Sequence, residues 1–250
     1  MGIIKTKGIV TKIVNYSDND KILTVITADQ GKIQVFCKGA QKPKSAILAS
    51  TEFLSFSEFV LYEGKSEMYN LSSADVIEVF YNIRIDLDKL SYATTMAQMM
   101  NDVCQEGELS YQKLQLFLNT LYVLSETDKN LDFVFSVFRI RLLAILGFIP
   151  RLASCTTCNR SGEQRAPQEI SEKYFSIKDN GLKCDVCARL DKGAVKMSEV
   201  TYTSIVYILS SDAKKIFSFE IPNKDLEELK LIAQVYTNEK LEKEYKVMKM

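Results

Sequence analysis

The stretch from residue 138 to residue 158 reads Phe138-Arg-Ile-Arg-Leu-Leu-Ala-Ile-Leu-Gly-Phe-Ile-Pro-Arg-Leu-Ala-Ser-Cys-Thr-Thr-Cys158. Its first part continues an apolar run from Leu131, which predicts a helix over 131–146 that is apolar on nearly every side and therefore buried. Gly147-Phe-Ile-Pro150 is a stop signal for that helix. A C-x-x-C pair follows directly, so one short stretch joins the centre of a helical core to two candidate metal ligands.

A second pair, Cys184-Asp-Val-Cys187, is separated from the first by residues 159–183. Each pair places two thiolates on one tight turn, and two such turns can close a tetrahedron around one zinc ion. Asp179-Asn-Gly181 predicts a hairpin turn that delivers the second pair. Four sulfur ligands leave no open position, so the predicted zinc is structural rather than catalytic. The alternatives are four unrelated buried cysteines or a redox dithiol pair, and the paired spacing favours zinc.

The composition excludes several reaction classes. The 250-residue chain contains no histidine, which excludes Ser-His-Asp and Cys-His relays and a His-ligated catalytic zinc. No apolar run approaches the roughly 20 residues that span a bilayer, and the first residues lack the apolar segment of a signal peptide. A cytoplasmic protein without membrane contact is expected.

The first eighty residues have the pattern of strands separated by turns. β-Branched residues and alternation of apolar and polar residues predict short strands. These strands are expected at 8–16, 21–27, 32–37, 56–62 and 67–71, the last with an extension at 76–79. Five short strands with turn punctuation predict a small closed or nearly closed barrel.

Lysines are concentrated on this predicted barrel. Residues 1–50 carry eight lysines against three aspartates, a net charge of +5 in a chain whose overall net charge is zero. One interpretation is nucleic-acid binding across a strand face, with lysines tracking phosphates. Tyr16 and Phe36 could stack on bases, but an aromatic residue in a strand is more often core, which is the interpretation favoured here. The candidate nucleic-acid contacts are Lys5, Lys7, Lys12, Lys38, Lys42 and Lys44.

After residue 82 the apolar period becomes helical. One helix is expected from Leu87 to Val103, and Ser110 is expected to cap a second helix. Two more are expected at 198–209 and 225–236. On the central helix over 131–146, Arg139 and Arg141 are costly to bury unless they are paired or directed to the surface.

This order of features resembles a known family. The resemblance rests on four segments: the basic loop 38–45 (Lys-Gly-Ala-Gln-Lys-Pro-Lys-Ser), the segment from Phe80 to Ala93, the helix ending at Pro150 and the two cysteine pairs. Together they resemble the bacterial RecO family of DNA repair and recombination mediators, in its zinc-bearing form. The resemblance covers nearly the whole chain, and its most specific part is the Arg-x-Arg-Leu-Leu-x-x-Leu-Gly-Phe-x-Pro stretch.

The resemblance implies an α+β fold with three parts. Residues 1–80 would form a five-stranded OB-fold β-barrel that binds DNA. Residues 81–150 and 192–250 would form an all-helical domain. Residues 151–191 would form an inserted four-cysteine zinc module, with one structural Zn²⁺ on Cys155, Cys158, Cys184 and Cys187.

The resemblance also implies a non-catalytic function. Members of the family bind single- and double-stranded DNA and anneal complementary strands. With RecR they help RecA to replace single-strand-binding protein (SSB) on gapped DNA, and RecF is a further candidate partner. This implies a nucleoid-associated protein. By position, Lys38, Lys42 and Lys44 would contact DNA phosphates, and Arg139 would meet the acidic C-terminal tail of SSB.

One departure and one alternative stand beside this resemblance. Asn180-Gly181 replaces the Gly-Gly that usually precedes the second cysteine pair, and an Asn-Gly turn can serve the same purpose. The alternative function is a zinc-stapled adaptor whose barrel and helices bind only proteins. Such an adaptor would show no salt-dependent binding to oligonucleotides.

Overall fold

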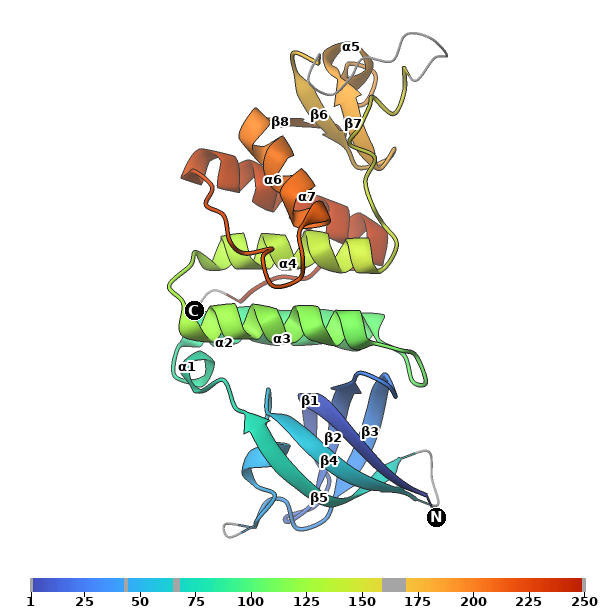
Figure 1. The fold of residues 1–250 in the computed structure, drawn as a ribbon, viewed down its shortest axis with the longest axis vertical. Coiled ribbons are helices and arrows are strands. Elements are labelled where there is room, and N and C mark those ends of the chain that lie inside the picture. Colours follow the sequence, from blue (N-terminus) through green and yellow to red (C-terminus); the bar gives the residue numbers. More distant parts are fainter. Residues whose placement is uncertain (1, 43–44, 65–67, 159–169, 249–250) are drawn as a thin grey trace. The chain divides into compact units, whose positions relative to one another are not determined.

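The computed structural model describes residues 2–42, 45–64, 68–158 and 170–248. The chain forms two compact units, residues 1–127 with 246–250 and residues 128–245, and Figure 1 shows the elements of each. The predicted division into domains at residues 80, 150 and 191 stays a prediction. Within the described ranges, no helix combines the length and the apolar character that crossing a bilayer would require.

Five strands at the start of the chain form a closed barrel in the order β1-β2-β3-β5-β4, with β1 paired again to β4. All neighbouring strands are antiparallel except β3 and β5, which run parallel. This arrangement confirms the predicted α+β fold class with an OB-fold barrel. The strands are β1 (Ile3–Asn15), β2 (Lys21–Thr27), β3 (Lys32–Cys37), β4 (Phe56–Glu63) and β5 (Tyr69–Glu78).

The barrel core follows from alternation along the strands. In β3, Ile33, Val35 and Cys37 are buried while their neighbours face outward, because successive side chains of a strand point to opposite faces. They pack with other buried residues, namely Val10, Leu23, Val25, Ala40, Phe59, Leu61 and Ala74. Cys37 is therefore a small core residue.

The ladders around the barrel differ in length. β1 and β4 are joined by seven residue pairs, whereas β3 and β5 meet in the described residues only through Val35–Tyr69 and Phe36–Asn70. Two paired residues give few inter-strand hydrogen bonds. The pairing of β3 with β5, which we call the β3–β5 seam, is therefore short, whereas the other neighbouring strands of the barrel pair over six or more residues.

Three helices complete the first unit: α1 (Tyr81–Arg84), α2 (Leu87–Val103) and α3 (Tyr111–Glu126). The Asp86 carboxylate caps α2 by accepting a hydrogen bond from the Lys89 amide at 3.0 Å. The predicted cap of α3 is wrong in its chemistry: Ser110 occupies the N-cap position, but its hydroxyl donates to the Glu108 carbonyl and accepts no amide of the helix.

The loop between α2 and α3 lies against the barrel. The Lys32 amide donates to the Gln105 carbonyl at 3.0 Å, and the Gly107 amide donates to the Gln30 carbonyl at 3.0 Å. Gly31 has φ +69°, and a Cβ there would overlap the Gln105 carbonyl. Only glycine combines that backbone angle with that close approach. Gly31 therefore lets the loop lie against the start of β3.

The described residues of the second unit combine three longer helices and one short helix with a small sheet. The helices α4 (Leu131–Ile145), α6 (Glu199–Ser210) and α7 (Asn223–Leu241) pack on one another. A three-stranded sheet has the order β7-β6-β8. Its elements are β6 (Lys173–Ser176), β7 (Gly181–Cys184), β8 (Val195–Met197) and the short helix α5 (Asp185–Ala188).

The central helix α4 is buried, as predicted: every residue from 133 to 140 is inaccessible to solvent or nearly so. The guanidinium groups of its two arginines donate hydrogen bonds to backbone carbonyls, which offsets the cost of burying them. Arg139 Nη2 donates to the Tyr245 carbonyl at 2.8 Å. Arg141 Nη1 donates to the carbonyls of Ile208 and Leu209 at 3.0 and 2.7 Å, which satisfies acceptors at the C-terminal end of α6.

Candidate functional site

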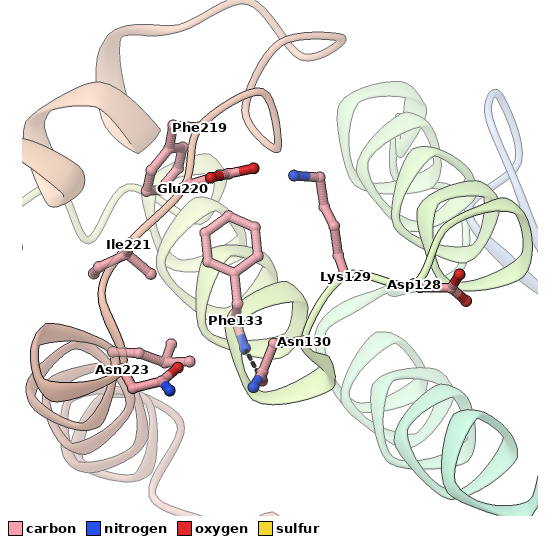
Figure 2. Close-up of a pocket in the computed structure, with 9 residues that line it drawn as sticks. Asp128, Lys129, Asn130, Phe133, Phe219, Glu220, Ile221 and Asn223 are labelled. Carbon is pink, nitrogen blue, oxygen red and sulfur yellow. Dashed lines mark hydrogen bonds between the residues drawn. The ribbon is translucent and has the colours of Figure 1, made fainter.

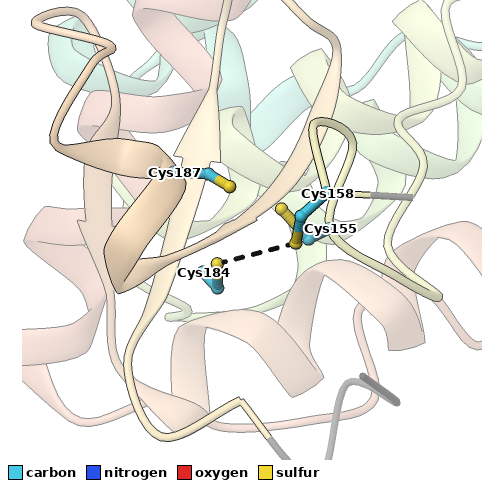
Figure 3. Close-up of side chains that lie close together, drawn as sticks. All are labelled: Cys155, Cys158, Cys184 and Cys187. Carbon is cyan, nitrogen blue, oxygen red and sulfur yellow. Dashed lines mark hydrogen bonds between the residues drawn. The ribbon is translucent and has the colours of Figure 1, made fainter. Parts of the chain in front are cut away.

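The four cysteines of the two C-x-x-C pairs converge in the second unit (Figure 3). Cys155 and Cys158 lie on the turn that follows α4, Cys184 ends β7, and Cys187 lies in α5. The four sulfur atoms lie within 4.8 Å of one another, and the Sγ atoms of Cys158 and Cys184 are 3.9 Å apart. Metal–sulfur bonds of about 2.3 Å in a tetrahedron give edges of roughly 3.8 Å. The cluster therefore has the size and the donors to hold a metal ion.

Backbone hydrogen bonds bring the first pair onto the hairpin that carries the second. The Thr156 amide donates to the Leu182 carbonyl at 2.7 Å, and the Leu182 amide donates to the Arg151 carbonyl at 2.8 Å. A Cβ on Gly181 would overlap the Arg151 carbonyl oxygen and lie 2.8 Å from the Thr156 methyl group. Asn180 takes the positive φ of the turn, at +53°. Asn180-Gly181 thus serves both the turn and the close approach.

A buried ion-pair network holds the second pair. Lys183 Nζ contacts Asp179 Oδ2 at 2.6 Å and Asp191 Oδ2 at 2.7 Å, and the Ser176 hydroxyl donates to Asp191 Oδ2 at 2.6 Å. Lys183 immediately precedes Cys184, and Asp191 lies four residues after Cys187. The network therefore fixes both flanks of the Cys184–Cys187 turn through protein groups alone.

The surroundings of the cluster change the pKa values of Cys155, Cys158 and Cys187 in different directions. Burial alone would raise the pKa of Cys155, but the amides of Cys158, Cys184 and Thr157 donate to its sulfur and lower the pKa to about 6. The thiol of Cys158 shares a hydrogen bond with Cys155, which raises the Cys158 pKa. Burial raises the pKa of Cys187. The Cys155 thiolate is thus favoured near neutral pH, and a cation bound at the cluster would displace protons from Cys158 and Cys187.

The barrel lysines fall into three groups rather than one cluster. Lys5 and Lys7 lie on β1 beside β4, where Lys5 Nζ forms an ion pair with Glu58 Oε2 at 2.9 Å. Lys12 stands in a row across three strands with Thr24 and Gln34. Lys38 and Lys42 are exposed on the loop after β3. Lys44 lies outside the described residues.

Lys12 borders a depression of about 560 Å³ on the outer side of β1, β2 and β3. Lys32, in the same wall, donates to the Asn101 carbonyl at 2.7 Å, which satisfies an acceptor at the C-terminal end of α2. The wall is completed by Thr24, Gln34, Met68, Asn101 and Glu106. A polar depression on this face is the usual place for ligands on OB-folds.

The expectation that Tyr16 is a core residue is wrong. Tyr16 lies just past the end of β1 and is 65% exposed. Its ring meets the half-buried ring of Phe36 edge to face, with centroids 5.6 Å apart and planes at 88°. A strand that ends at residue 16 is one residue too long, and the Ser17-Asp-Asn-Asp20 segment that follows is the turn signal that could have corrected it.

Arg139, the candidate contact for the SSB tail, is 4% exposed. Its guanidinium lies 4.0 Å from the centre of the Phe135 ring and donates to the Tyr245 carbonyl. Because the guanidinium is almost fully buried, an incoming carboxylate would reach it only if the residues that cover it moved.

A cavity in the second unit was not expected from the sequence. It has a volume of about 400 Å³ and lies where α4 and α7 begin. Phe133 and Phe219 meet edge to face there, with ring centroids 4.9 Å apart. Figure 2 shows the charged ends of Lys129 and Glu220 facing one another beside the Phe133 ring. The two lining segments are far apart in sequence, so no local motif announces the cavity.

Comparisons with known proteins match the whole length of the chain. A family model described as Recombination protein O N terminal matches residues 1–80, and one described as Recombination protein O C terminal matches residues 84–249. A protein named DNA repair protein RecO from Acetivibrio thermocellus is 43% identical over 245 residues, covering 98% of this chain and 94% of that protein. A protein of the same name from Caldicellulosiruptor bescii is 32% identical over 248 residues, covering 99% and 97%.

Proposed function

Because the chain belongs to the RecO family of DNA repair proteins, we propose that it is a non-catalytic recombination mediator. It binds single- and double-stranded DNA, anneals complementary strands and, with RecR, helps RecA to replace SSB on gapped DNA; RecF is a further candidate partner. This role places it in the cytoplasm at the nucleoid. The observation that carries the proposal is the match of both family models, which together span the barrel and the helices.

The proposed DNA contacts are lysines of the barrel, above all those on the loop after β3. Lysines that neutralise phosphates release counterions, which gives sequence-independent and salt-sensitive binding. Contacts to the backbone leave the base edges free to pair, as annealing requires. Lys38 and Lys42 are exposed on that loop, whereas Lys5 already shares its charge with Glu58. We therefore rank the loop lysines first and Lys5 last among the six candidates.

The proposed role of the cysteine cluster is to hold one structural Zn²⁺. Four thiolates fill a tetrahedral coordination shell and leave no position for water or substrate. The sheet and turns around the cluster are small, and a metal ion supplies folding free energy that such a module cannot gain from its core. In this proposal, Cys155, Cys158, Cys184 and Cys187 shape the protein and take no part in chemistry on DNA.

The proposed partner of the helical part is the acidic C-terminal tail of SSB, with Arg139 as the candidate contact. Binding at Arg139 would require the residues that cover it to move. Lys129, in the cavity of Figure 2, is an accessible cation on the segment that leads into the same helix. Replacing Arg139 and Lys129 separately with glutamine, and measuring binding of an acidic tail peptide, tests which cation the tail uses. Equal affinity in both variants would contradict the Arg139 contact.

The proposed function is tested by titrating the metal-loaded protein with labelled single- and double-stranded oligonucleotides at about 50 and 200 mM salt. The complementary strand is then added and annealing is followed. We expect salt-sensitive binding and faster annealing than without protein. No binding even at the lower salt concentration would instead favour the adaptor that binds only proteins.

A triple variant locates the DNA surface. Replacing Lys38, Lys42 and Lys44 with glutamate should abolish annealing while the barrel stays folded. The matched control replaces Lys178, Lys192 and Lys224, which are exposed residues of the second unit, and changes the net charge equally. Unchanged annealing in the first variant would place the DNA contacts elsewhere.

A further inference from the structure

Tyr16 is an exposed aromatic side chain at the rim of the barrel. Most of its surface is open to solvent, and it follows directly on the last residue of β1. Exposing a large aromatic ring has no benefit for the stability of the barrel, because the ring gains little burial there. The ring is therefore accessible to a ligand outside the chain.

The ring is held in place before any ligand arrives. The Tyr16 amide donates to the Asp20 carbonyl at 3.0 Å, and the Ser17 hydroxyl donates to Asp20 Oδ2 at 3.0 Å. These bonds close a tight turn beneath the ring. The edge-to-face contact with Phe36 then fixes the ring orientation. A preorganised aromatic ring loses little conformational entropy when a ligand stacks on it.

The turn that carries Tyr16 is joined to the lysine loop after β3. The Gly39 amide donates to Asp20 Oδ1 at 2.8 Å, and Gln41 Nε2 donates to the Ser17 carbonyl at 2.9 Å. The Gly39 amide is also the main cause that lowers the pKa of Asp20, and the charges of Lys38 and Lys42 lower it further. Tyr16, Lys38 and Lys42 therefore belong to one surface, which we call the rim patch.

Charge alone gives the described part of this patch little attraction for phosphate. Lys38 and Lys42 are accompanied by Asp18 and Asp20 in the adjoining turn, so the four formal charges cancel. Both Asp20 oxygens accept hydrogen bonds, from Gly39 and Ser17, but its charge remains. A nucleic acid that binds here needs an interaction besides phosphate neutralisation, and an exposed ring beside two lysines supplies it.

We propose that Tyr16, supported by Phe36, is a stacking platform for one base of single-stranded DNA at the rim patch. This inference rests on the proposed function and deepens it, because it gives the barrel a preference for unpaired over paired strands. A base in a duplex has both faces covered by its neighbours, whereas an unpaired base can offer one face to the ring. The stacked base keeps its pairing edge exposed, so the contact is compatible with annealing.

The absence of tryptophan from the chain makes a direct spectroscopic test possible. Tyr16→Trp creates a single tryptophan on the platform. We expect its fluorescence to be quenched by an oligothymidylate strand and not by an abasic strand of the same length and charge. The control is Tyr122→Trp, because Tyr122 is similarly exposed, at 61%, but lies on α3. Equal quenching in the two variants, or no base-dependent quenching in the Tyr16→Trp protein, would overturn the platform.

Affinities give the second readout. Tyr16→Ala should weaken binding to oligothymidylate about 5- to 150-fold, the range that a stacked base contributes, whereas Tyr16→Phe should bind as the unchanged protein does. Binding to duplex DNA should be the same in all three proteins. If the unchanged protein binds no DNA, the proposed function fails. If it binds but Tyr16→Ala binds equally well, only the platform fails.

Discussion

The cysteine cluster and the barrel rim are organised in opposite ways. In the cluster, polar and ionisable groups are buried and satisfied by partners inside the same small module, as with Lys183, Asp179 and Asp191. At the rim, charged and aromatic side chains stay exposed and have only a few partners each, as with Asp20, which accepts from the Gly39 amide and the Ser17 hydroxyl. The comparison teaches that a buried site depends on its own side chains for shape, whereas an exposed site can lose a side chain and keep its shape.

The largest expected effect is loss of the metal from the cluster. Structural zinc supplies roughly 10–16 kcal/mol in isolated zinc-finger peptides, which matches or exceeds the ~5–15 kcal/mol that stabilises a typical domain. Replacing Cys155 and Cys184 with alanine should therefore unfold the module around β6 and β7, while the barrel stays folded. Hydrogen exchange of the two regions measures both outcomes.

The matched control for this variant replaces Cys37 and Cys104 with alanine, since both are buried cysteines outside the cluster. That protein should keep one metal ion per chain. A single cooperative collapse of barrel and module in the Cys155→Ala, Cys184→Ala protein would break the comparison, because it would show that the two regions are not independent.

The next effect concerns the close approach at Gly181. Alanine there would push the first cysteine turn away from the hairpin, and overpacking of this kind costs about 1–3 kcal/mol. We expect Gly181→Ala to lower metal affinity in competition with a chelator. Gly193→Ala is the control, because its Cβ would lie 3.6 Å from its nearest neighbour, Asp191 Oδ1. Equal metal affinity in both variants would refute the role of the close approach.

A smaller effect should come from the ion-pair network. Lys183 and Ser176 donate to Asp191 and lower its pKa. A carboxylate with a lowered folded pKa stabilises the fold above its unfolded pKa, near 3.8, and this contribution is lost as the pH falls through the folded pKa. Asp191→Asn should cost about 2 kcal/mol at neutral pH and should remove part of the acid dependence. Thermal unfolding between about pH 7 and pH 3 tests this; an identical acid dependence in both proteins would contradict it.

The smallest effect is expected at Lys5. Its ion pair with Glu58 is exposed, and such pairs contribute little to stability. A lysine that contacts phosphate should reduce the salt slope of single-strand binding by about 0.7 when it is removed. We expect this reduction for Lys38→Gln and a much smaller one for Lys5→Gln. The reverse order would move the DNA surface from the rim patch to the β1–β4 side.

The same contrast explains which features could be predicted from the sequence. The C-x-x-C spacing predicted the cluster, because four ligands on two local turns leave little to tertiary structure. The strand and helix periods predicted the barrel and α4, because burial of one face dominates those elements. Arg141 and the Gly31 contact could not be predicted, since their partners lie on other elements. Tyr16 was misjudged because one residue decides whether a side chain at the end of a strand is inside or outside.

The short seam between β3 and β5 has a consequence for local opening. Within the described residues this ladder is joined through two residue pairs, so it loses few hydrogen bonds when it separates. We therefore expect local opening there at a lower free energy than global unfolding. Phe36, which supports Tyr16, is one of the seam residues. Phe36 is also paired with Ile22 of β2, so its contact with the Tyr16 ring would survive an opening between β3 and β5.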